Sequence, residues 1–565
     1  MMMSDTNKPT DLSMRWTLGT LLVLCFFLFF YRLGSYPFFD IDEPRYAEAA
    51  REMLESGNWI TPYFNYELRL EKPVFFYWLA ALSYKVFGIG EFGARFASAA
   101  MAAIMVLATF GFGRALISNR FGFYAALILA TSIQVFGLAR MSITDMTLAS
   151  LMALTTLSLF LVAHKNLKFW LLAGLFAGLA ILTKGPVGIV LPGGVLVLYA
   201  LWTGQLKRVL LNRWFALALL VAAAVSLPWY VLAYQQNGQI FLDSLVFNNV
   251  DRFSSVVTGH DQDRFQFGPV NVFFVVVLLV GFMPWTAYLP VAFWKGRKLQ
   301  AEDNSAHNML SFVTRFAMVW VTLIFVFFSF SQTKLLTYIL PLFPGLSLWL
   351  AAVFYRARQN QDPNLTRAFA VSGWVLFAVL GVVAVTALAL KAKIAAAVPV
   401  EAQYLVQNPL NVFAVLTLVV GVGCVALLMS KKQITQALLA QAITMVFVGV
   451  IALHHIVPAV NEVMQGDMLS FVKTIGDKPV AVYEIQRPSL TFYARKQVPH
   501  IKHDEYDRFY QLLSQNQQKT GETVLYVITK NKYLQQLENL EPAKATVQLL
   551  ENGPVYSLLA VEKSK

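Results

Sequence analysis

The sequence has few charged residues, few cysteines and no motif for binding a nucleotide phosphate. Only 14% of its 565 residues are charged, against about 25% in an average globular domain, which argues against an ordinary soluble enzyme and against a disordered chain. The two cysteines, Cys25 and Cys424, both lie within long apolar runs, so a scaffold held by disulfides is excluded. No glycine-rich phosphate loop after a strand and no GK[ST] motif is present, and we therefore expect no nucleotide cofactor.

The sequence also lacks the charge pattern of a nucleic-acid-binding protein. Its net charge is +13, but no basic run stands on a polar scaffold with aromatic residues between the charges. In so apolar a chain, Lys and Arg are expected at the cytoplasmic ends of membrane helices and around phosphate-bearing ligands. We therefore expect contact with membrane lipids and no nucleic-acid partner.

Long apolar runs fill most of the sequence, which is 57% hydrophobic. A helix needs about 20 apolar residues to cross the hydrocarbon core of a membrane, and by this measure we count about 13 candidate transmembrane helices. They cover residues 16–31, 92–117, 121–139, 146–163, 169–183, 187–204, 214–235, 270–294, 313–330, 336–355, 368–390, 411–429 and 437–457. The expected fold class is an α-helical polytopic membrane protein.

The composition changes once, near residue 460. The segment 461–565 contains 13 Lys and Arg and 12 Asp and Glu, so roughly a quarter of it is charged, as in a soluble domain. Its runs PVAVYE, TVLYVIT, ATVQLLE and YSLLAVE predict strands, and 504–516 and 532–540 predict helices. We expect a transmembrane domain at 1–460 and a soluble α/β domain at 461–565.

The positions of Lys and Arg orient the spans. If the apolar run 74–88 does not cross the membrane, every second loop is basic, and the positive-inside rule places all of those loops in the cytoplasm. This run is short and contains Lys85, so we interpret it as an interfacial helix. The long loops 33–91 and 236–269 (the first and fourth outer loops) then lie on the outer side with the C-terminal domain.

The outer loops contain charged residues that membrane insertion does not require. Asp42 and Arg45 come directly after the first span, and the first outer loop closes with Glu71-Lys72-Pro73. Other outer loops contribute Arg140, Asp145, Lys184, His260, Arg264, Lys334 and Tyr338. Outer cations oppose the positive-inside trend, and one anionic ligand explains them together, because Arg and Lys neutralise phosphate. Simpler explanations are helix capping for Asp42 and snorkelling to lipid headgroups for Lys72.

Carboxylates beside phosphate-binding cations indicate transfer of a group from a phosphate. The cations stabilise the charge that develops as the phosphate departs, and a carboxylate orients or deprotonates the acceptor. Because no nucleotide-binding motif is present, a donor that already resides in the membrane, a lipid-linked phosphate, fits this sequence best.

Several motifs resemble those of GT-C integral-membrane glycosyltransferases. The first outer loop reads DEPRYAEAAREMLESGNWITP, then LEKP, YW, FG and EFGAR, and later come Asp145, TKGP, SLPWY and QTKLLTYILPLFP. Within this class the sequence most resembles the bacterial 4-amino-4-deoxy-L-arabinose lipid A transferases, relatives of protein O-mannosyltransferases. The resemblance implies a GT-C fold in the bacterial inner membrane, with the active site and the C-terminal domain on the periplasmic side.

The resemblance also implies roles for residues at matching positions. Asp42 and Asp145 match the two acidic positions, the first of which is taken as catalytic. The donor phosphate is expected to bind at Arg45, Tyr46, Arg69, Lys72, Arg264, Lys334 and Tyr338. Glu71 and His260 match a divalent metal site, expected to hold zinc, although a hydrogen-bonded loop histidine explains His260 equally well. The fourth outer loop reads FNNVDRF, which departs from the pattern expected in close relatives, so the residues that recognise the sugar are not carried over.

The function implied by the resemblance is that of an inverting glycosyltransferase. It would move a sugar, expected to be 4-amino-4-deoxy-L-arabinose, from undecaprenyl phosphate to a lipid A phosphate, which gives resistance to cationic antimicrobial peptides and polymyxin. Asp42 could act as a general base or orient the aminosugar. Two alternatives stay open: a GT-C transferase that puts another polyprenyl-linked sugar on protein or glycan, and a transporter of lipid-linked sugars, although no duplicated halves are visible.

Overall fold

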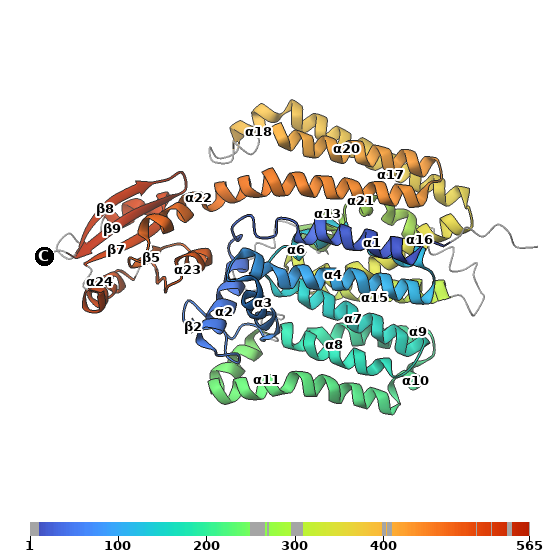
Figure 1. The fold of residues 1–565 in the computed structure, drawn as a ribbon, viewed down its shortest axis with the longest axis horizontal. Helices are drawn as coiled ribbons and strands as arrows, with labels where there is room; N and C mark the ends of the chain where they lie inside the picture. The colour runs from blue at the N-terminus through green and yellow to red at the C-terminus, as the bar shows by residue number, and fades with distance from the viewer. Residues whose placement is uncertain are drawn as a thin grey trace, which may run out of the picture.

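A bundle of long helices carries a smaller unit of strands and helices at one end (Figure 1). The structure is a computed structural model, and it describes residues 11–248, 266–267, 270–294, 309–397, 403, 409–503, 505–520, 523–538 and 545–563. The predicted class, a helical bundle followed by a small α/β unit, is confirmed.

The first half of the bundle contains α1 (Met14–Cys25) with the π-helical turn η1 (Phe26–Phe30), α2 (Asp42–Ser56), α3 (Phe75–Phe87), α4 (Glu91–Leu116), α5 (Asn119–Ala130), α6 (Ile133–Ala139), α7 (Thr144–His164), α8 (Phe169–Lys184), α9 (Val187–Trp202), α10 (Leu206–Leu210) and α11 (Arg213–Val246). The second half contains α13 (Phe273–Gly281), η4 (Trp285–Tyr288), α15 (Met309–Ser329), η5 (Leu336–Leu342), α16 (Phe343–Gln359), α17 (Pro363–Ala389), α18 (Lys391–Ala397), α20 (Pro409–Ser430), α21 (Ile434–Ile451), η6 (Ala452–Ile456) and α22 (Val457–Ile475). Two short hairpins, β1 (Tyr63–Phe64) with β2 (Glu67–Leu68) and β3 (Gln266–Phe267) with β4 (Val270–Asn271), lie in the loops.

The chain is a multi-pass membrane protein by the length and apolarity of its helices. Eight helices within the described ranges are long and apolar enough to cross a membrane, or ten if each of two bent pairs counts as one span. The bent pairs are α5 with α6, at 67°, and α13 with the helical segment Trp285–Trp294, at 106°. Three predicted spans fall on apolar helices of 17 residues or fewer, namely Met14–Phe30, α8 and α9. The expected total of about 13 spans therefore stays a prediction.

Glycines allow the closest helix packing in the bundle, as at the contact of α4 with α5. A Cβ atom on Gly113 would lie 2.7 Å from the Cα atom of Gly122, and one on Gly122 would lie 2.4 Å from the carbonyl oxygen of Phe110. Small residues let helix backbones approach closely inside a membrane, where dispersion contacts take over from the hydrophobic effect. This packing sets the direction of α4, whose first turns adjoin the first outer loop.

Helix α3 does not extend along the bundle like the long spans. It has 13 residues, short of the roughly 20 needed to cross, and it lies with α2 at the end of the bundle nearest the C-terminal unit (Figure 1). The basic helix α10 lies at the opposite end (Figure 1). The first outer loop and the basic connector 205–213 are thus at opposite ends, as the charge pattern predicts.

The C-terminal unit is a five-stranded mixed sheet. Its strand order is β6-β5-β7-β9-β8, from β5 (Val480–Tyr483), β6 (His500–Ile501), β7 (Val524–Lys530), β8 (Ala545–Asn552) and β9 (Tyr556–Lys563). Its helices are α23 (Pro488–Ala494), α24 (Tyr506–Thr520) and α25 (Leu534–Glu538), with the short turn η7 (Asn531–Tyr533). Alternate residues of β5 enter two cores, one with α24 and one with α22 and α23, because successive side chains of a strand point to opposite faces.

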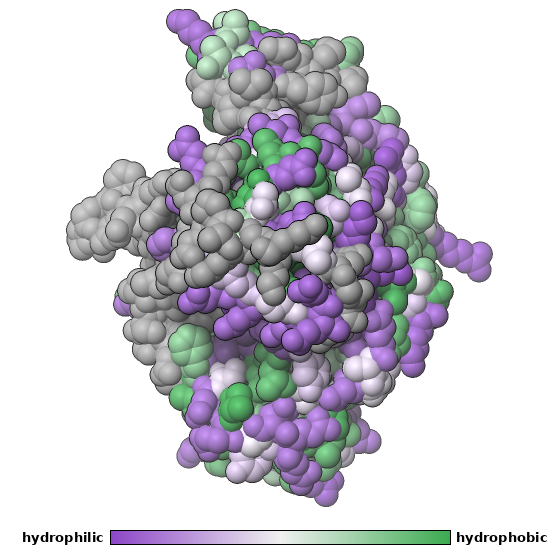
Figure 2. All heavy atoms as spheres, turned by 90° about the vertical axis from the view of Figure 1, so that its left-hand side faces the viewer, coloured by the Kyte–Doolittle hydropathy of each residue, from purple (hydrophilic) through white to green (hydrophobic). Residues whose placement is uncertain are grey.

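The long helical segment Ile434–Ile475 connects the bundle to this unit and includes the π-helical η6. The predicted domain boundary at 460/461 falls inside α22, so the division of the chain at that point stays a prediction. The end of the molecule that carries the C-terminal unit displays mainly hydrophilic side chains in Figure 2. This polar end is where the first outer loop and the C-terminal unit meet.

Candidate active site

The first turn of α2 presents Asp42 and Arg45 at this polar end. The helix starts at Asp42 and ends before Gly57, whose φ of 68° is the left-handed conformation that glycine adopts readily. The residue before the helix, Ile41, supplies no side-chain cap. The side chain of Asp42 is 71% exposed and one of its oxygens lies 3.9 Å from Arg45. The carboxylate is therefore available to a ligand and is not used as a cap.

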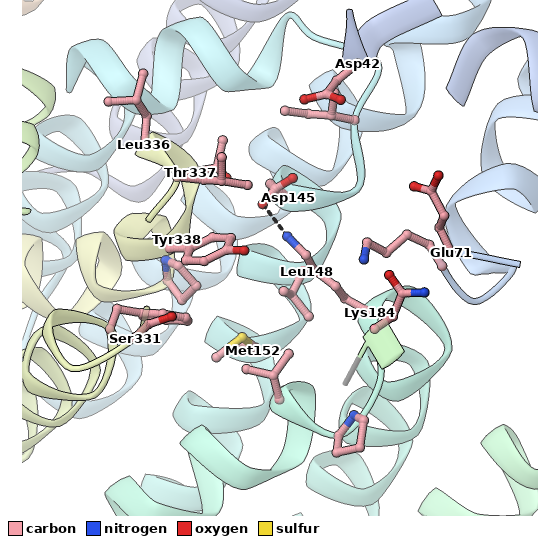
Figure 3. A pocket seen from close by; sticks show the side chains of 18 of the residues that line it. Asp42, Glu71, Asp145, Leu148, Met152, Lys184, Ser331, Leu336, Thr337 and Tyr338 are labelled. Carbon is pink, nitrogen blue, oxygen red and sulfur yellow. Dashed lines mark hydrogen bonds and ion pairs between the residues drawn. The ribbon is translucent and has the colours of Figure 1, made fainter. Parts of the chain in front are cut away.

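A cavity of about 550 Å³ opens beside this turn. Eight of the residues that the sequence predicts for the site line it: Asp42, Arg45, Tyr46, Arg69, Glu71, Lys72, Asp145 and Tyr338. They come from α2, the hairpin loop, α7 and η5, which are separated by up to about three hundred residues in the chain. Figure 3 shows that Asp42, Asp145 and Glu71 face one common space. The two predicted acids therefore lie at the same end of the bundle.

Asp145 forms an ion pair with Lys184 across the wall of this cavity. The Nζ atom of Lys184 donates to Oδ1 of Asp145 at 2.7 Å, and the two side chains are only 16% and 13% exposed. The same ammonium lies 5.3 Å from the ring centre of Tyr338, and Thr337 adjoins the Asp145 carboxylate (Figure 3). The sequence identifies Lys184 only as an outer-loop cation in the motif TKGP and does not predict its pairing with Asp145.

Arg69 is held by aromatic rings and by Glu71. Its guanidinium lies 5.4 Å from the ring centre of Tyr46 and 5.7 Å from that of Phe64, and two of its nitrogens lie 3.3 Å from the two carboxylate oxygens of Glu71. Burial raises the pKa of the Tyr46 hydroxyl, so this ring stays neutral beside the cation. Lys72 is close enough to Asp145 to interact electrostatically.

Apolar residues complete the cavity below the charged rim. They include Leu148, Met152, Val187, Val190, Phe327, Phe328 and Leu336, and Leu148 and Met152 lie beneath Asp145 in Figure 3. A charged rim above an apolar floor at the edge of a membrane bundle suits an amphiphile with an anionic head and a hydrocarbon tail.

Lys334 is the predicted site residue that the structure places outside the cavity lining. Its ammonium donates to the carbonyl oxygens of Ser329, at 3.1 Å, and Ser331, at 2.5 Å. Burial lowers the pKa of this lysine. The ammonium therefore caps the end of α15, an arrangement that sequence spacing alone does not reveal. Arg264 and His260 lie outside the described residues, as does most of the fourth outer loop.

A buried ion pair fixes the helix that carries Asp42. Glu43 and Arg95 are both completely buried, and the guanidinium of Arg95 donates to the two oxygens of Glu43 at 2.6 and 3.0 Å. The backbone N–H groups of Phe39, at 2.9 Å, and Ser142, at 3.0 Å, also donate to Glu43. One carboxylate thus joins the first outer loop, α4 and the loop before Asp145, a role that its place beside Asp42 in the sequence did not indicate.

The predicted metal site has only one of its two ligands within the described ranges. Across those ranges, no three His, Cys, Asp or Glu side chains gather closely enough to hold a metal ion. The Glu71 carboxylate is engaged by Arg69 at 3.3 Å, which is the partner expected of a structural ion pair. Zinc at Glu71 and His260 stays a prediction.

The chain is similar in sequence to two families of glycosyltransferases. Residues 71–231 match the family model described as dolichyl-phosphate-mannose-protein mannosyltransferase, and residues 475–565 match the C-terminal domain of cyanobacterial RgtA-type glycosyltransferases. Among curated proteins, the chain is 31% identical over 377 residues to the undecaprenyl phosphate-alpha-4-amino-4-deoxy-L-arabinose arabinosyl transferase of Aeromonas hydrophila, which is 64% of this chain and 65% of that protein. It is 33% identical over 380 residues to arabinosyl transferase 2 of Pseudomonas fluorescens, covering 66% of this chain and 65% of that protein.

The fold is that of a solved transferase over almost the whole chain. A crystal structure of ArnT from Cupriavidus metallidurans bound to undecaprenyl phosphate superposes with a TM-score of 0.78 at 21% identity, covering 97% of this chain and 98% of that one. The sequence matches to the curated relatives span about 65% of their length. The predicted resemblance to GT-C glycosyltransferases, and to the aminoarabinose transferases among them, is confirmed.

Proposed function

Because the chain is ArnT-like in sequence and fold, we propose that it is a glycosyltransferase that moves a sugar from undecaprenyl phosphate to lipid A. The sugar is 4-amino-4-deoxy-L-arabinose, as the names of the curated relatives state for those proteins. The observation that carries the proposal is one cavity that joins the carboxylates Asp42 and Asp145, the cations Arg45, Arg69 and Lys72, and an apolar floor.

The cations neutralise the phosphate of the donor and the second negative charge that the phosphate gains when it leaves. The phosphodiester of a polyprenyl-linked sugar carries one negative charge, and polyprenyl phosphate carries a second when it leaves. Arg45 and Lys72 lie at the rim where this charge develops, and fixed positive groups in a partly water-excluded cavity stabilise the transition state more than the ground state. Arg69 contributes less, because Glu71 already neutralises part of its charge.

The two carboxylates have different surroundings and therefore different roles. Asp145 is paired with Lys184 at 2.7 Å, and this pair shapes the cavity wall next to the sugar. Asp42 is largely exposed, with Arg45 3.9 Å away, so its charge is available at the reacting centre. It can hold the ammonium of an aminosugar or stabilise cationic character at the anomeric carbon.

The reaction is a single displacement at the anomeric carbon. An oxygen of the lipid A phosphate attacks that carbon, a new carbon–oxygen bond forms, and the bond to the donor phosphate breaks with inversion. Undecaprenyl phosphate takes the bonding electrons. A phosphate acceptor is already ionised, so Asp42 is not required as a base; with a hydroxyl acceptor it would accept the proton.

The orientation of the protein follows from its charges. The basic connector 205–213 lies at the end of the bundle opposite the cavity, and Lys and Arg favour the cytoplasmic side. We place the cavity and the C-terminal unit on the periplasmic side of the inner membrane, where modification of lipid A would confer resistance to polymyxin.

A reconstituted assay tests the proposal. Purified protein in detergent is mixed with lipid A and undecaprenyl-phosphate aminoarabinose, and lipid A is followed by mass spectrometry. A mass increase of one aminopentose is expected. Transfer only from another polyprenyl-linked sugar, or only to a protein or glycan acceptor, would contradict these substrates. It would identify a GT-C transferase with a different donor or acceptor. Movement of intact donor across liposomes without any transfer would identify a transporter.

A further inference from the structure

We propose that the C-terminal unit positions the helix that carries Asp42 and Arg45, through a contact between Ser489 and Asp40. The inference rests on the proposed function and assigns a role in it to the soluble unit. It starts from a buried carboxylate that the transfer reaction does not use.

Asp40 is bound by the start of α23 in the C-terminal unit. The backbone N–H of Ser489 donates to Oδ1 of Asp40 at 3.0 Å, and its hydroxyl donates to Oδ2 at 2.5 Å. Arg487 lies 3.8 Å from Oδ2, and the Asp40 side chain is only 2% exposed. A buried carboxylate is costly unless it is paired and hydrogen-bonded, so this contact favours one docked arrangement of the two segments.

The segment before Asp40 is fixed by the same part of the chain. The backbone N–H of Phe38 donates to the Tyr493 hydroxyl at 3.0 Å, and that hydroxyl donates to Glu91 at 2.8 Å. The amide of Gln465 in α22 donates to the carbonyl oxygen of Phe38 at 2.5 Å. The rings of Phe38 and Phe492 meet edge to face at 4.8 Å. The approach to α2 is thus defined by α22 and α23, on the far side of the membrane bundle from its cytoplasmic loops.

Asp40 is two residues from Asp42, and no side-chain cap holds the start of α2. Contacts on either side of Asp42 hold the start of α2 instead. Glu43 binds Arg95 and Ser142 in the bundle, and Asp40 binds Ser489 in the C-terminal unit. Asp42 lies between these two anchors, so its direction into the cavity depends on both.

Arg45 touches the C-terminal unit directly. Its Nη2 atom donates to the amide oxygen of Gln486 at 3.4 Å. Gln486 and Arg487 lie in the loop between β5 and α23, and Ser489 follows them in the first turn of α23. A catalytic group displaced by about 1 Å can lose about a hundredfold in rate, so a contact that fixes both Asp42 and Arg45 affects transfer without touching the substrate. Ser489 and Asp40 are therefore positioning residues.

The matched variants are Ser489→Ala, Asp40→Asn and Ser557→Ala. Ser557 is a second fully buried serine of the C-terminal unit, with hydrogen bonds to Asn531 at 2.7 Å and Asn552 at 2.9 Å, and it does not contact α2. We expect Ser489→Ala and Asp40→Asn each to lower kcat about tenfold, the size expected for a hydrogen bond to a charged group. The double variant should be no worse than the poorer single variant. Ser557→Ala should keep kcat within about twofold.

A second readout does not depend on turnover. Hydrogen exchange of the backbone amides at 42–48 should become faster in Ser489→Ala than in Ser557→Ala, at equal protein stability. Unchanged exchange at 42–48 in Ser489→Ala would overturn the inference, and so would an equal loss of kcat in Ser557→Ala. If the unaltered protein transfers no sugar, the proposed function fails, and the exchange experiment still decides whether Ser489 holds α2.

Discussion

Lys184, the last residue of α8, donates to Asp145 in the first turn of α7 at 2.7 Å and so closes one wall of the cavity. Both side chains are mostly buried. The attraction is strong because little water reaches the pair, and for the same reason a single unpaired charge there is costly.

Removing the lysine of this pair should therefore harm the protein more than removing both charges. We expect Lys184→Met to lower the thermal unfolding temperature and the rate of transfer. Asp145→Asn combined with Lys184→Met should regain most of the stability and none of the activity. The measurement is thermal unfolding in detergent beside the lipid A assay, and an unfolding temperature unchanged in Lys184→Met would show that the pair is not coupled.

The pair between Glu43 and Arg95 gives a prediction about stability alone. Both side chains are fully buried, and breaking such a pair costs about 3–5 kcal/mol. Glu43→Gln should therefore lower the free energy of unfolding by this order. The control is Glu55→Gln, which breaks a pair with Arg51 at 2.5 Å whose carboxylate is 46% exposed, and an exposed pair contributes about 1 kcal/mol or less. Equal effects of the two variants would contradict the account.

Sequence reasoning predicted the elements better than the contacts between them. The four strands predicted from alternating apolar residues are four of the five strands of the C-terminal sheet, namely β5, β7, β8 and β9. Strand β6 has only two residues, too few for a recognisable alternation. The helix α23 was missed for a similar reason, because seven residues give little periodicity.

The partners of charged residues could not be predicted, because they depend on the fold. Asp145 and Lys184 are 39 residues apart, and Asp40 and Ser489 are 449 apart. Lys334 was predicted as a site residue but does not line the cavity. Its ammonium donates hydrogen bonds to the carbonyl oxygens of Ser329 and Ser331. The side chain is used in local hydrogen bonds to the backbone, which a list of charged residues in the sequence does not reveal.

The pH dependence of stability should reflect Glu52. Burial, with the neighbouring Glu48, raises the pKa of Glu52 to about 8. In the unfolded chain the pKa of a glutamate is about 4.3. The folded state therefore favours the protonated acid, and this stabilising effect is full below the unfolded pKa and is lost as the pH rises through about 8.

We accordingly expect the unfolding temperature to fall between pH 5 and pH 8 (roughly the interval between the two pKa values), and the fall to be smaller in Glu52→Gln. Glu67→Gln, at an exposed position of β2, is the matched control and should keep the slope of the unaltered protein. An identical slope in all three proteins would show that Glu52 does not control the effect.

Lys72 should contribute to donor affinity more than to folding. A hydrogen bond to a charged group contributes about 1.5–3 kcal/mol, so we expect Lys72→Met to weaken the binding of undecaprenyl phosphate about tenfold or more. Lys431→Met removes an exposed charge in the basic connector after α20 and should leave the Kd unchanged. Both variants are measured by titration at one fixed salt concentration, and equal Kd values would remove Lys72 from the donor site.

The exposed carboxylate of Asp42 gives the most direct test of the account. Asp42→Asn keeps the size of the side chain and removes its charge, and Asp477→Asn makes the same change at an exposed position of the C-terminal unit. Turnover of aminoarabinose onto lipid A is measured together with the Kd for undecaprenyl phosphate. We predict that Asp42→Asn loses turnover by at least about a hundredfold, with the Kd and unfolding temperature kept, while Asp477→Asn transfers normally. Turnover retained in Asp42→Asn would contradict the placement of the reacting centre in this cavity.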